Sequence, residues 1–253
     1  VKENFMIINV ARKELKSLFA SPMGWIILSI LMFGFGTLYL QGVNSYFEVM
    51  SGAVRPAERV GVTIYVGSQI YSTALFLLSV TTPMLTMRLI SEERKSQTMP
   101  FLLSAPISLT EIVVGKFLGL VIFLSILVIY IFAMLSTLNI WADIDFGYLI
   151  GNSFGFILLI ASFTALGIFF SSLTNQPIIA AITTFIALVS MVGLGSYFAS
   201  DPSHWFNYIS MTKHYQSFTR GVFDSADIVY YLLFIVTFLT LTVRRLDSDR
   251  LRG

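Results

Sequence analysis

The chain has 253 residues, of which 56% are hydrophobic and only 12% are charged, and its net charge is +2. A soluble domain carries about 25% charged residues, so this composition indicates a chain whose main solvent is lipid. The small net charge gives no reason to expect a nucleic-acid partner. The absence of cysteine excludes disulfides and cysteine nucleophiles, and two histidines are too few for a histidine-based metal centre. We expect no metal, no bound cofactor and no catalytic residue in this chain.

Residues 1–22 have the pattern of an amphipathic helix rather than the short apolar core of a signal peptide. Basic and polar side chains fill one face, which suits a helix lying in the membrane interface on the cytoplasmic side. Ser21-Pro22 should end this helix before the chain enters the bilayer. The apolar residues recurring at helical spacing are Phe5, Ile8, Ala11, Leu15, Leu18 and Phe19.

Six later segments are long and apolar enough to cross a bilayer, and none contains Asp, Glu, Lys or Arg. Continuous apolar runs of this kind predict helices, because barrel strands would alternate apolar and polar residues. We therefore predict an all-α integral membrane protein with six spans in a single domain, 1–253. The spans are 23–40, 64–87, 117–138, 148–170, 177–198 and 228–243.

The basic residues predict the orientation of these spans. With both termini on one side, that side holds twelve of the 16 Lys and Arg residues, and the other side holds Arg55, Arg59, Lys213 and Arg220. Since cytoplasmic loops carry the excess of basic residues, we place both termini in the cytoplasm of a bacterial inner membrane. The loop 88–116 then lies in the cytoplasm, where ATP is available.

The loop 88–116 reads as a helical elbow between the second and third spans. Its first part continues the second helix, and Pro100 should break or kink that helix near Met99. Ser108 and Glu111 have the spacing of a capping box, so the third helix should begin near Ser108 and enter the membrane after Lys116. A solvated loop that only maintains topology is the alternative interpretation.

The elbow resembles the signature of type-2 ABC transporter permeases, and the details look closest to the gliding-motility branch of that family. Similar motifs occur at the start of the chain, in Ala11-Arg12-Lys13-Glu14-Leu15, and before the last span, in Arg220-Gly221-Val222. The resemblance covers nearly the whole chain. Within the elbow it is carried by Glu92-Glu93-Arg94, Thr98, Leu102-Leu103, Ala105-Pro106-Ile107-Ser108, Glu111-Ile112-Val113 and Gly115-Lys116.

The chain departs from the family pattern at two places in the elbow. Gln97 stands where the family usually has Gly before Thr98, and Met99-Pro100 stands where it usually has Leu-Glu. These departures put the helix geometry of the elbow in question, but not its existence.

The resemblance implies the permease subunit of an ATP-binding cassette exporter, with two permease chains and two copies of a separate ATPase subunit that binds ATP and Mg. The chain lacks a phosphate-binding Gly-x-x-x-x-Gly-Lys-Ser/Thr loop, so it would not hold ATP itself. The second permease chain could be identical or related. The residues that the resemblance assigns to ATPase coupling are Glu92, Glu93, Arg94, Thr98, Phe101, Leu102, Leu103, Pro106, Ser108 and Glu111.

Polar residues on the second and fifth spans are candidates for a pathway or dimer interface, because the resemblance implies that the first, second and fifth spans form it. Ordinary hydrogen bonding between helices is the simpler interpretation of each residue. Helix packing likewise accounts for the glycine pairs Gly34/Gly36 and Gly151/Gly155. The candidate pathway or interface residues are Gln69, Ser72, Thr73, Thr183 and Thr184.

The segment 199–227 is too short and polar to span the membrane and reads as an external interfacial or re-entrant element. Docking of a periplasmic accessory protein is an alternative role for it. A secondary transporter or an intramembrane protease would place ionisable residues within the spans, and this chain has none there. A membrane anchor that transmits force in an ATPase-driven envelope machine, without moving a substrate, remains the alternative function.

Overall fold

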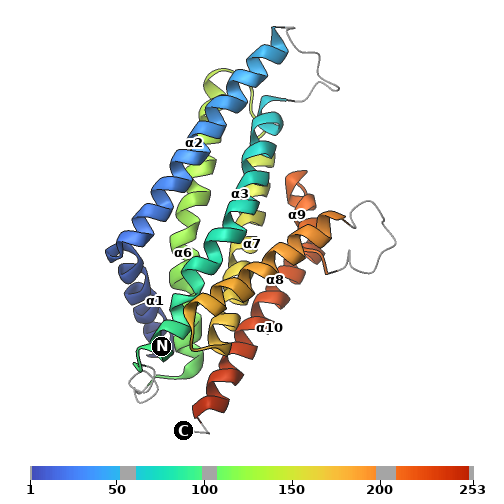
Figure 1. Cartoon of the computed structure of the whole chain (residues 1–253). Helices are drawn as coiled ribbons and strands as arrows, with labels where there is room; N and C mark the ends of the chain where they lie inside the picture. The colour runs from blue at the N-terminus through green and yellow to red at the C-terminus, as the bar shows by residue number, and fades with distance from the viewer. Residues whose placement is uncertain (1, 52–60, 99–106, 198–208, 251–253) are drawn as a thin grey trace.

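The computed structural model describes residues 2–51, 61–98, 107–197 and 209–250, and all regular elements in these ranges are helices. The long helices lie side by side, and both ends of the chain lie at the same end of the bundle (Figure 1). The helices are α1 (Lys2–Ala20), α2 (Pro22–Met50), α3 (Val62–Thr86), η1 (Arg88–Glu92), α4 (Glu93–Lys95), α6 (Leu109–Ser136), η2 (Thr137–Ile140), α7 (Phe146–Leu173), α8 (Pro177–Tyr197), α9 (Met211–Thr219) and α10 (Ser225–Arg250).

Five helical stretches in the described residues are long and apolar enough to cross a membrane. Each contains one of the predicted spans and extends beyond it, most clearly α2, which runs to Met50 rather than to residue 40. The predicted span 177–198 is also helical, as α8, but its described apolar stretch, Pro177–Gly193, is shorter than the other five. Five spans are therefore supported by length and composition, and the span 177–198 stays a prediction.

Helix α7 forms the centre of the bundle and packs against α3, α6, α8 and α10. In the most apolar stretch of α7, 72% of the residues are buried, whereas only 28% and 22% of the residues are buried in the corresponding stretches of α2 and α10. The large side chains of Phe156 and Phe163 on α7 are fully buried. Gly167, which has no side chain, allows α3 to approach α7 closely at Thr86. The core of the protein is thus built around α7, with the other helices outside it.

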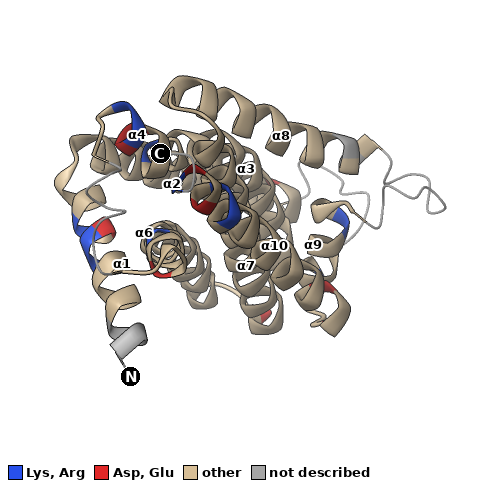
Figure 2. Cartoon of the chain, turned by 90° about the horizontal axis from the view of Figure 1, so that it is seen from below, with Lys and Arg blue, Asp and Glu red and all other residues tan. Residues whose placement is uncertain are grey.

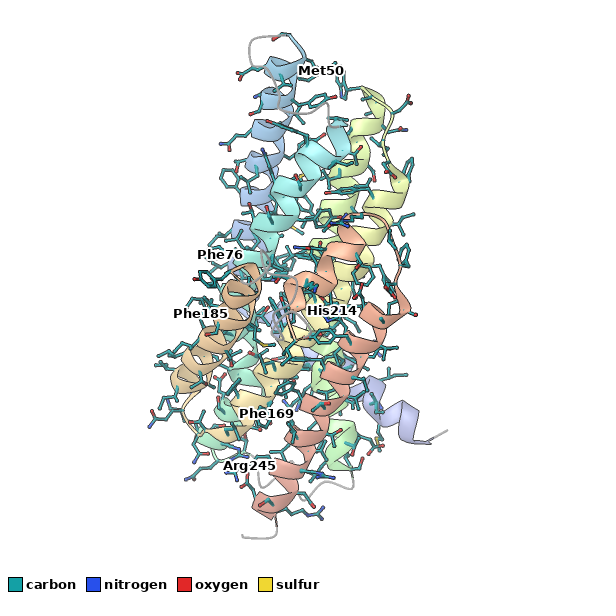
Figure 3. All side chains as sticks on the ribbon, turned by 90° about the vertical axis from the view of Figure 1, so that its right-hand side faces the viewer. Met50, Phe76, Phe169, Phe185, His214 and Arg245 are labelled. Atoms are coloured by element: carbon teal, nitrogen blue, oxygen red, sulfur yellow. The ribbon has the colours of Figure 1, made fainter. Side chains whose placement is uncertain are left out.

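The outer surface of the bundle is strongly apolar. Phe76 on α3 is 60% exposed and Phe185 on α8 is 37% exposed, and both lie on the outside of the molecule (Figure 3). Apolar patches of this extent are rare on water-soluble monomers but are the expected surface of helices in lipid. The structure therefore agrees with the integral membrane protein that the composition predicts.

Helix α1 is separate from α2, as the sequence predicts. It ends at Ala20, and α2 begins at Pro22 after the extended residue Ser21. On α6, Gly115 and Gly119 are spaced four residues apart and let α1 approach closely. A Cβ atom added to Gly119 would lie 2.8 Å from Cβ of Glu14. This contact fixes α1 against the first turns of α6, and its membrane-interface location stays a prediction.

Helix α9 occupies part of the predicted external segment 199–227 and packs against α7, α8 and α10. The pair Gly151 and Gly155 on α7 makes room for it, since Cβ atoms at either position would lie within 3.0 Å of Phe218. Helix packing is therefore the role of this glycine pair, as predicted, and its partner is α9. The other pair differs, because Gly36 approaches the Tyr130 hydroxyl whereas a Cβ at Gly34 would meet nothing within 4 Å in this chain.

Polar contacts from α7 and α10 help to hold α9 in place, among them a hydrogen bond from the Tyr231 hydroxyl to the Met211 carbonyl at 2.8 Å. The Tyr215 hydroxyl donates to Oδ1 of Asn152 on α7 at 3.2 Å, and His214 Nδ1 lies 2.6 Å from Oδ1 of Asp227 on α10. Burial raises the pKa of Tyr215 well above its ordinary value, so the hydroxyl stays protonated and keeps donating. Segment 199–227 therefore contains a helix fixed to the bundle, at least over its described part.

Candidate functional site

Charged side chains gather at the end of the bundle that carries both termini. Figure 2 looks onto this end and shows Lys, Arg, Asp and Glu residues on α1, α4 and the last turns of α10. The described residues of the predicted elbow also lie here, because α3 ends and α6 begins at this end. The predicted coupling residues that the structure describes are thus close to α1 and to the C-terminal helix.

The first leg of the elbow continues α3 through the π-helical turn η1 into the short helix α4. The leg ends in a Schellman motif, in which Thr98 N–H donates to Glu93 O at 3.0 Å and Gln97 N–H donates to Arg94 O at 3.2 Å. Gln97 has φ of 57°, in the left-handed region that favours glycine. The departure from the family pattern at Gln97 therefore falls on a residue whose backbone geometry suits glycine.

The second leg begins with the predicted capping box. The Glu111 N–H donates to Ser108 Oγ at 3.2 Å, and the Ser108 N–H donates to Oε2 of Glu111 at 2.8 Å. These bonds satisfy amide donors that the first turn of a helix leaves without partners. Helix α6 accordingly starts at Leu109, as predicted, and Glu111 caps it.

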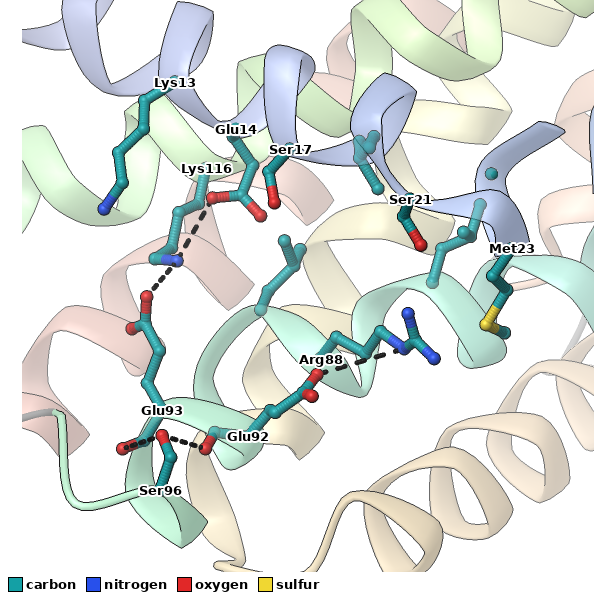
Figure 4. Close-up of a pocket in the computed structure, with 14 residues that line it drawn as sticks. Lys13, Glu14, Ser17, Ser21, Met23, Arg88, Glu92, Glu93, Ser96 and Lys116 are labelled. Atoms are coloured by element: carbon teal, nitrogen blue, oxygen red, sulfur yellow. Dashed lines mark hydrogen bonds and ion pairs between the residues drawn. The ribbon is translucent and has the colours of Figure 1, made fainter.

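A buried lysine joins the two legs of the elbow. Lys116 on α6 has a side chain only 5% exposed, and its Nζ lies 2.8 Å from Oε1 of Glu93 and 3.3 Å from Oε2 of Glu14 (Figure 4). Removing an ammonium group from water is costly unless carboxylates compensate its charge, so this geometry ties three elements together. The base of the elbow is closed by Lys116, and α1 is bound to it through Glu14.

The same region contains a cavity of about 390 Å³ between α1, the start of α2 and the first leg of the elbow. Arg88 and Glu92 line it and form an i,i+4 pair with Nε and Oε2 3.9 Å apart (Figure 4). Both side chains are substantially exposed, 41% and 56%. A solvent-exposed pair of this kind contributes little stability, so Arg88 and Glu92 are available to a partner.

Arg94 faces the opposite side of the first leg and pairs with Asp249 near the end of α10. Arg245, on the same helix, lies 3.6 Å from the other carboxylate oxygen of Asp249. The Arg94 side chain is only 13% exposed. The first leg is thus bound to α10 by one charge pair and to α6 by another.

The six predicted coupling residues that the structure describes fall into three pairs. Glu93 and Arg94 are engaged in ion pairs inside the chain, and Ser108 and Glu111 cap α6. Glu92 and Thr98 are exposed at the first leg. The remaining four, Phe101, Leu102, Leu103 and Pro106, lie outside the described residues, as does the predicted break at Met99-Pro100.

Four of the predicted pathway or interface residues donate a hydrogen bond within their own helices. Both Ser72 and Thr73 donate to the Gln69 carbonyl, while Thr183 and Thr184 donate to the Ala180 carbonyl. Within this chain these four hydroxyls therefore donate to carbonyls about one turn earlier in the same helix, and their place in a pathway or dimer interface stays a prediction. Gln69, Ser72 and Thr183 are exposed on the outer surface, whereas Thr184 is buried.

Lys116, Glu14 and Asp249 belong to the site but were not among the predicted coupling residues, although Lys116 lies in the Gly115-Lys116 motif of the resemblance. Glu14 lies within the Ala11–Leu15 motif and could have been suspected as a helix residue facing a buried cation. Asp249 carries no sequence signal beyond its position after the last span. In the described part of the chain, no group of three or more His, Cys, Asp or Glu residues is arranged to hold a metal ion.

Comparison with known protein families identifies the family to which the chain is similar. The profile of the ABC-2 family transporter proteins matches residues 8–251, almost the whole chain. No curated protein sequence matches the chain significantly. The matched region includes α1 from residue 8, the elbow and the helices that position it.

Proposed function

We propose, from the premise that this chain belongs to the ABC-2 family of transporter proteins, that it is an exporter permease driven by an ATPase docked on its elbow. Family membership makes the chain an integral membrane protein and a permease of an ABC transporter, which works with an ABC ATPase subunit. The permease itself is not the catalytic component. The direction of transport and the docking site are the proposed parts.

The observation that carries the docking site is the closure of the elbow by Lys116. Its pairs with Glu93 and Glu14 link both legs and α1, so a push on the elbow would move these elements together. A loop without such links would absorb a displacement by bending locally. Exposed Glu92 at the first leg supplies a charge that a basic groove of the ATPase would recognise.

We further propose an assembly of two permease chains and two ATPase subunits in a bacterial inner membrane. ATP and Mg would bind to the ATPase, and both termini of the permease would face it in the cytoplasm. The unequal distribution of Lys and Arg supports this orientation, as does the charged end of the bundle that carries both termini.

Purification of the chain from native membranes in mild detergent, followed by mass spectrometry, tests this assignment. We expect a stoichiometric ATPase with a phosphate-binding loop to accompany the permease. Cross-linking before solubilisation would preserve a weak complex. Recovery of the chain alone under both conditions would contradict the proposed complex, and co-purifying periplasmic proteins without an ATPase would indicate an envelope anchor instead.

A further inference from the structure

The connection between α3 and the elbow is a π-helical turn, η1, rather than a continued α-helix. π-helical geometry accounts for well under 1% of residues in globular proteins and occurs mostly as single turns at functional sites. Another irregularity precedes it, because Pro83 lies inside α3 and lacks the N–H that would bond one turn back. The segment from Pro83 to Glu92 is therefore the place where α3 departs most from regular helix geometry.

One buried hydroxyl of α7 is inserted into this turn. Ser171 Oγ accepts from the Ser91 N–H at 3.1 Å and donates to the Met87 carbonyl at 3.2 Å. In an α-helix, residue 91 would bond directly to the carbonyl of Met87, since each N–H pairs with the carbonyl four residues earlier. Insertion of a side chain into this ladder is a recognised cause of a helix irregularity. The Ser171 hydroxyl therefore bridges the Ser91 N–H and the Met87 carbonyl, in place of the direct hydrogen bond between them.

The same hydroxyl makes a third hydrogen bond, accepting from the Ile90 N–H at 3.3 Å. A serine hydroxyl has one donor and two acceptor sites, so Ser171 Oγ is fully satisfied by this turn alone. Ser171 is 0% exposed, as are Ser91 and the neighbouring Thr86. Water therefore has no direct access to replace the hydroxyl. Loss of the hydroxyl would leave the buried Ile90 and Ser91 amides short of an acceptor.

The backbones of α7 and α3 approach closely one turn earlier, at Gly167. A Cβ atom added there would lie 2.7 Å from Cβ of Thr86, closer than side chains pack. Gly167 and Ser171 are spaced four residues apart and thus lie on the same face of α7. This face contacts the helix just before the π turn and then inserts Oγ into the turn itself.

We propose that Ser171 is a positioning residue that latches the base of the elbow to the central helix α7. The inference rests on the proposed docking of an ATPase on the elbow and deepens it by naming the route of the movement. With the latch closed, displacement of α4 carries the end of α7 with it. Without the latch, the π turn yields and α4 moves while α7 stays in place.

The test compares Ser171→Ala with Ser172→Ala in the permease–ATPase complex, by hydrogen exchange with mass spectrometry. Ser172 is adjacent to Ser171 in sequence and equally buried, but its hydroxyl donates to the Phe169 carbonyl within α7. Peptides covering 83–98 and 163–173 are followed without nucleotide and with ATP and Mg under conditions that block hydrolysis.

Without nucleotide, we expect Ser171→Ala to speed exchange of the Ile90 and Ser91 amides about tenfold, because both lose an acceptor. With ATP, the elbow peptide 83–98 should respond in every variant, while the response of 163–173 should be lost only in Ser171→Ala. Ser171→Thr keeps the hydroxyl and should restore both the amide protection and the response of α7. Restoration by threonine would distinguish positioning by Oγ from a general packing defect.

An ATP response of 163–173 that is the same in Ser171→Ala and Ser172→Ala would overturn the latch while leaving the docked ATPase intact. Unchanged exchange of Ile90 and Ser91 in Ser171→Ala would overturn it as well. The absence of any ATP response in the elbow of the wild-type complex would instead contradict the proposed docking site, and the inference would fall with it.

Discussion

The Lys116 ammonium group lies between the carboxylates of Glu93 and Glu14, at 2.8 and 3.3 Å, and is almost completely buried. Glu93 belongs to the first leg of the elbow and Lys116 to the second, while Glu14 belongs to α1. A single cation thus determines how three elements meet. Glu93→Lys would place two cations together in the chain before any ATPase binds, so it would disturb the elbow itself.

Lys116→Met should destabilise the permease by about 3 kcal/mol, since it leaves two partly buried carboxylates without their cation. Thermal unfolding of the purified chain in detergent measures this effect. Lys95→Met is the matched control, because Lys95 is exposed on α4, and it should shift the unfolding temperature little. Equal shifts for the two variants would contradict the structural role of Lys116.

Gln97→Gly should stabilise the end of the first leg by about 1 kcal/mol, because glycine adopts the left-handed region without steric cost. The Thr98 amide, which donates to Glu93 O, should then exchange about fivefold more slowly. Ser96→Gly is the control: Ser96 has φ of −81°, which any residue adopts, so glycine there should speed exchange. Slower exchange in both variants would argue against the Schellman motif.

Gly119→Ala should weaken the contact between α1 and α6 by about 1–3 kcal/mol through overpacking. The added Cβ would lie 3.0 Å from the Ala11 carbonyl oxygen, which belongs to the backbone and does not move aside easily. Gly34→Ala, with nothing within 4 Å of the added atom, supplies the comparison. Limited proteolysis of α1 should be faster in Gly119→Ala, and identical digestion of the two variants would count against this packing.

Tyr215→Phe should cost about 1 kcal/mol, because buried Asn152 loses the donor to its side-chain oxygen. Tyr39→Phe removes a hydroxyl that bonds at an exposed position, to Thr137, and should be nearly neutral. Unfolding of both variants in detergent gives the comparison. A Tyr215→Phe protein as stable as Tyr39→Phe would show that the tie between α9 and α7 contributes nothing.

The helices and the capping box could be predicted because they depend on local sequence. The apolar run 148–170 and the Ser108–Glu111 spacing each specify their structure without distant partners. The ion pairs between distant elements could not be predicted. Glu14 and Lys116 are about a hundred positions apart, and the local sequence around either residue does not identify the other as its partner.

Serine hydroxyls illustrate the same limit within a span. Ser171 and Ser172 are adjacent, buried and chemically identical, yet only Ser171 reaches the backbone of another helix. The orientation of α7 against α3 decides between them, and that orientation depends on packing around Gly167. The predicted span 177–198 differs again. Its hydropathy predicts an apolar run to residue 198, whereas the apolar stretch that the structure describes ends at Gly193.

Docking of an ATPase on the elbow can be tested by site-directed photo-cross-linking in native membranes. A photoreactive residue replaces Lys95, exposed on α4, or Trp141, which is 77% exposed beyond the far end of α6. We expect position 95 to cross-link to a protein with a phosphate-binding loop and position 141 not to do so. Cross-linking of the ATPase at 141, or at neither position while the complex still co-purifies, would contradict docking on the elbow.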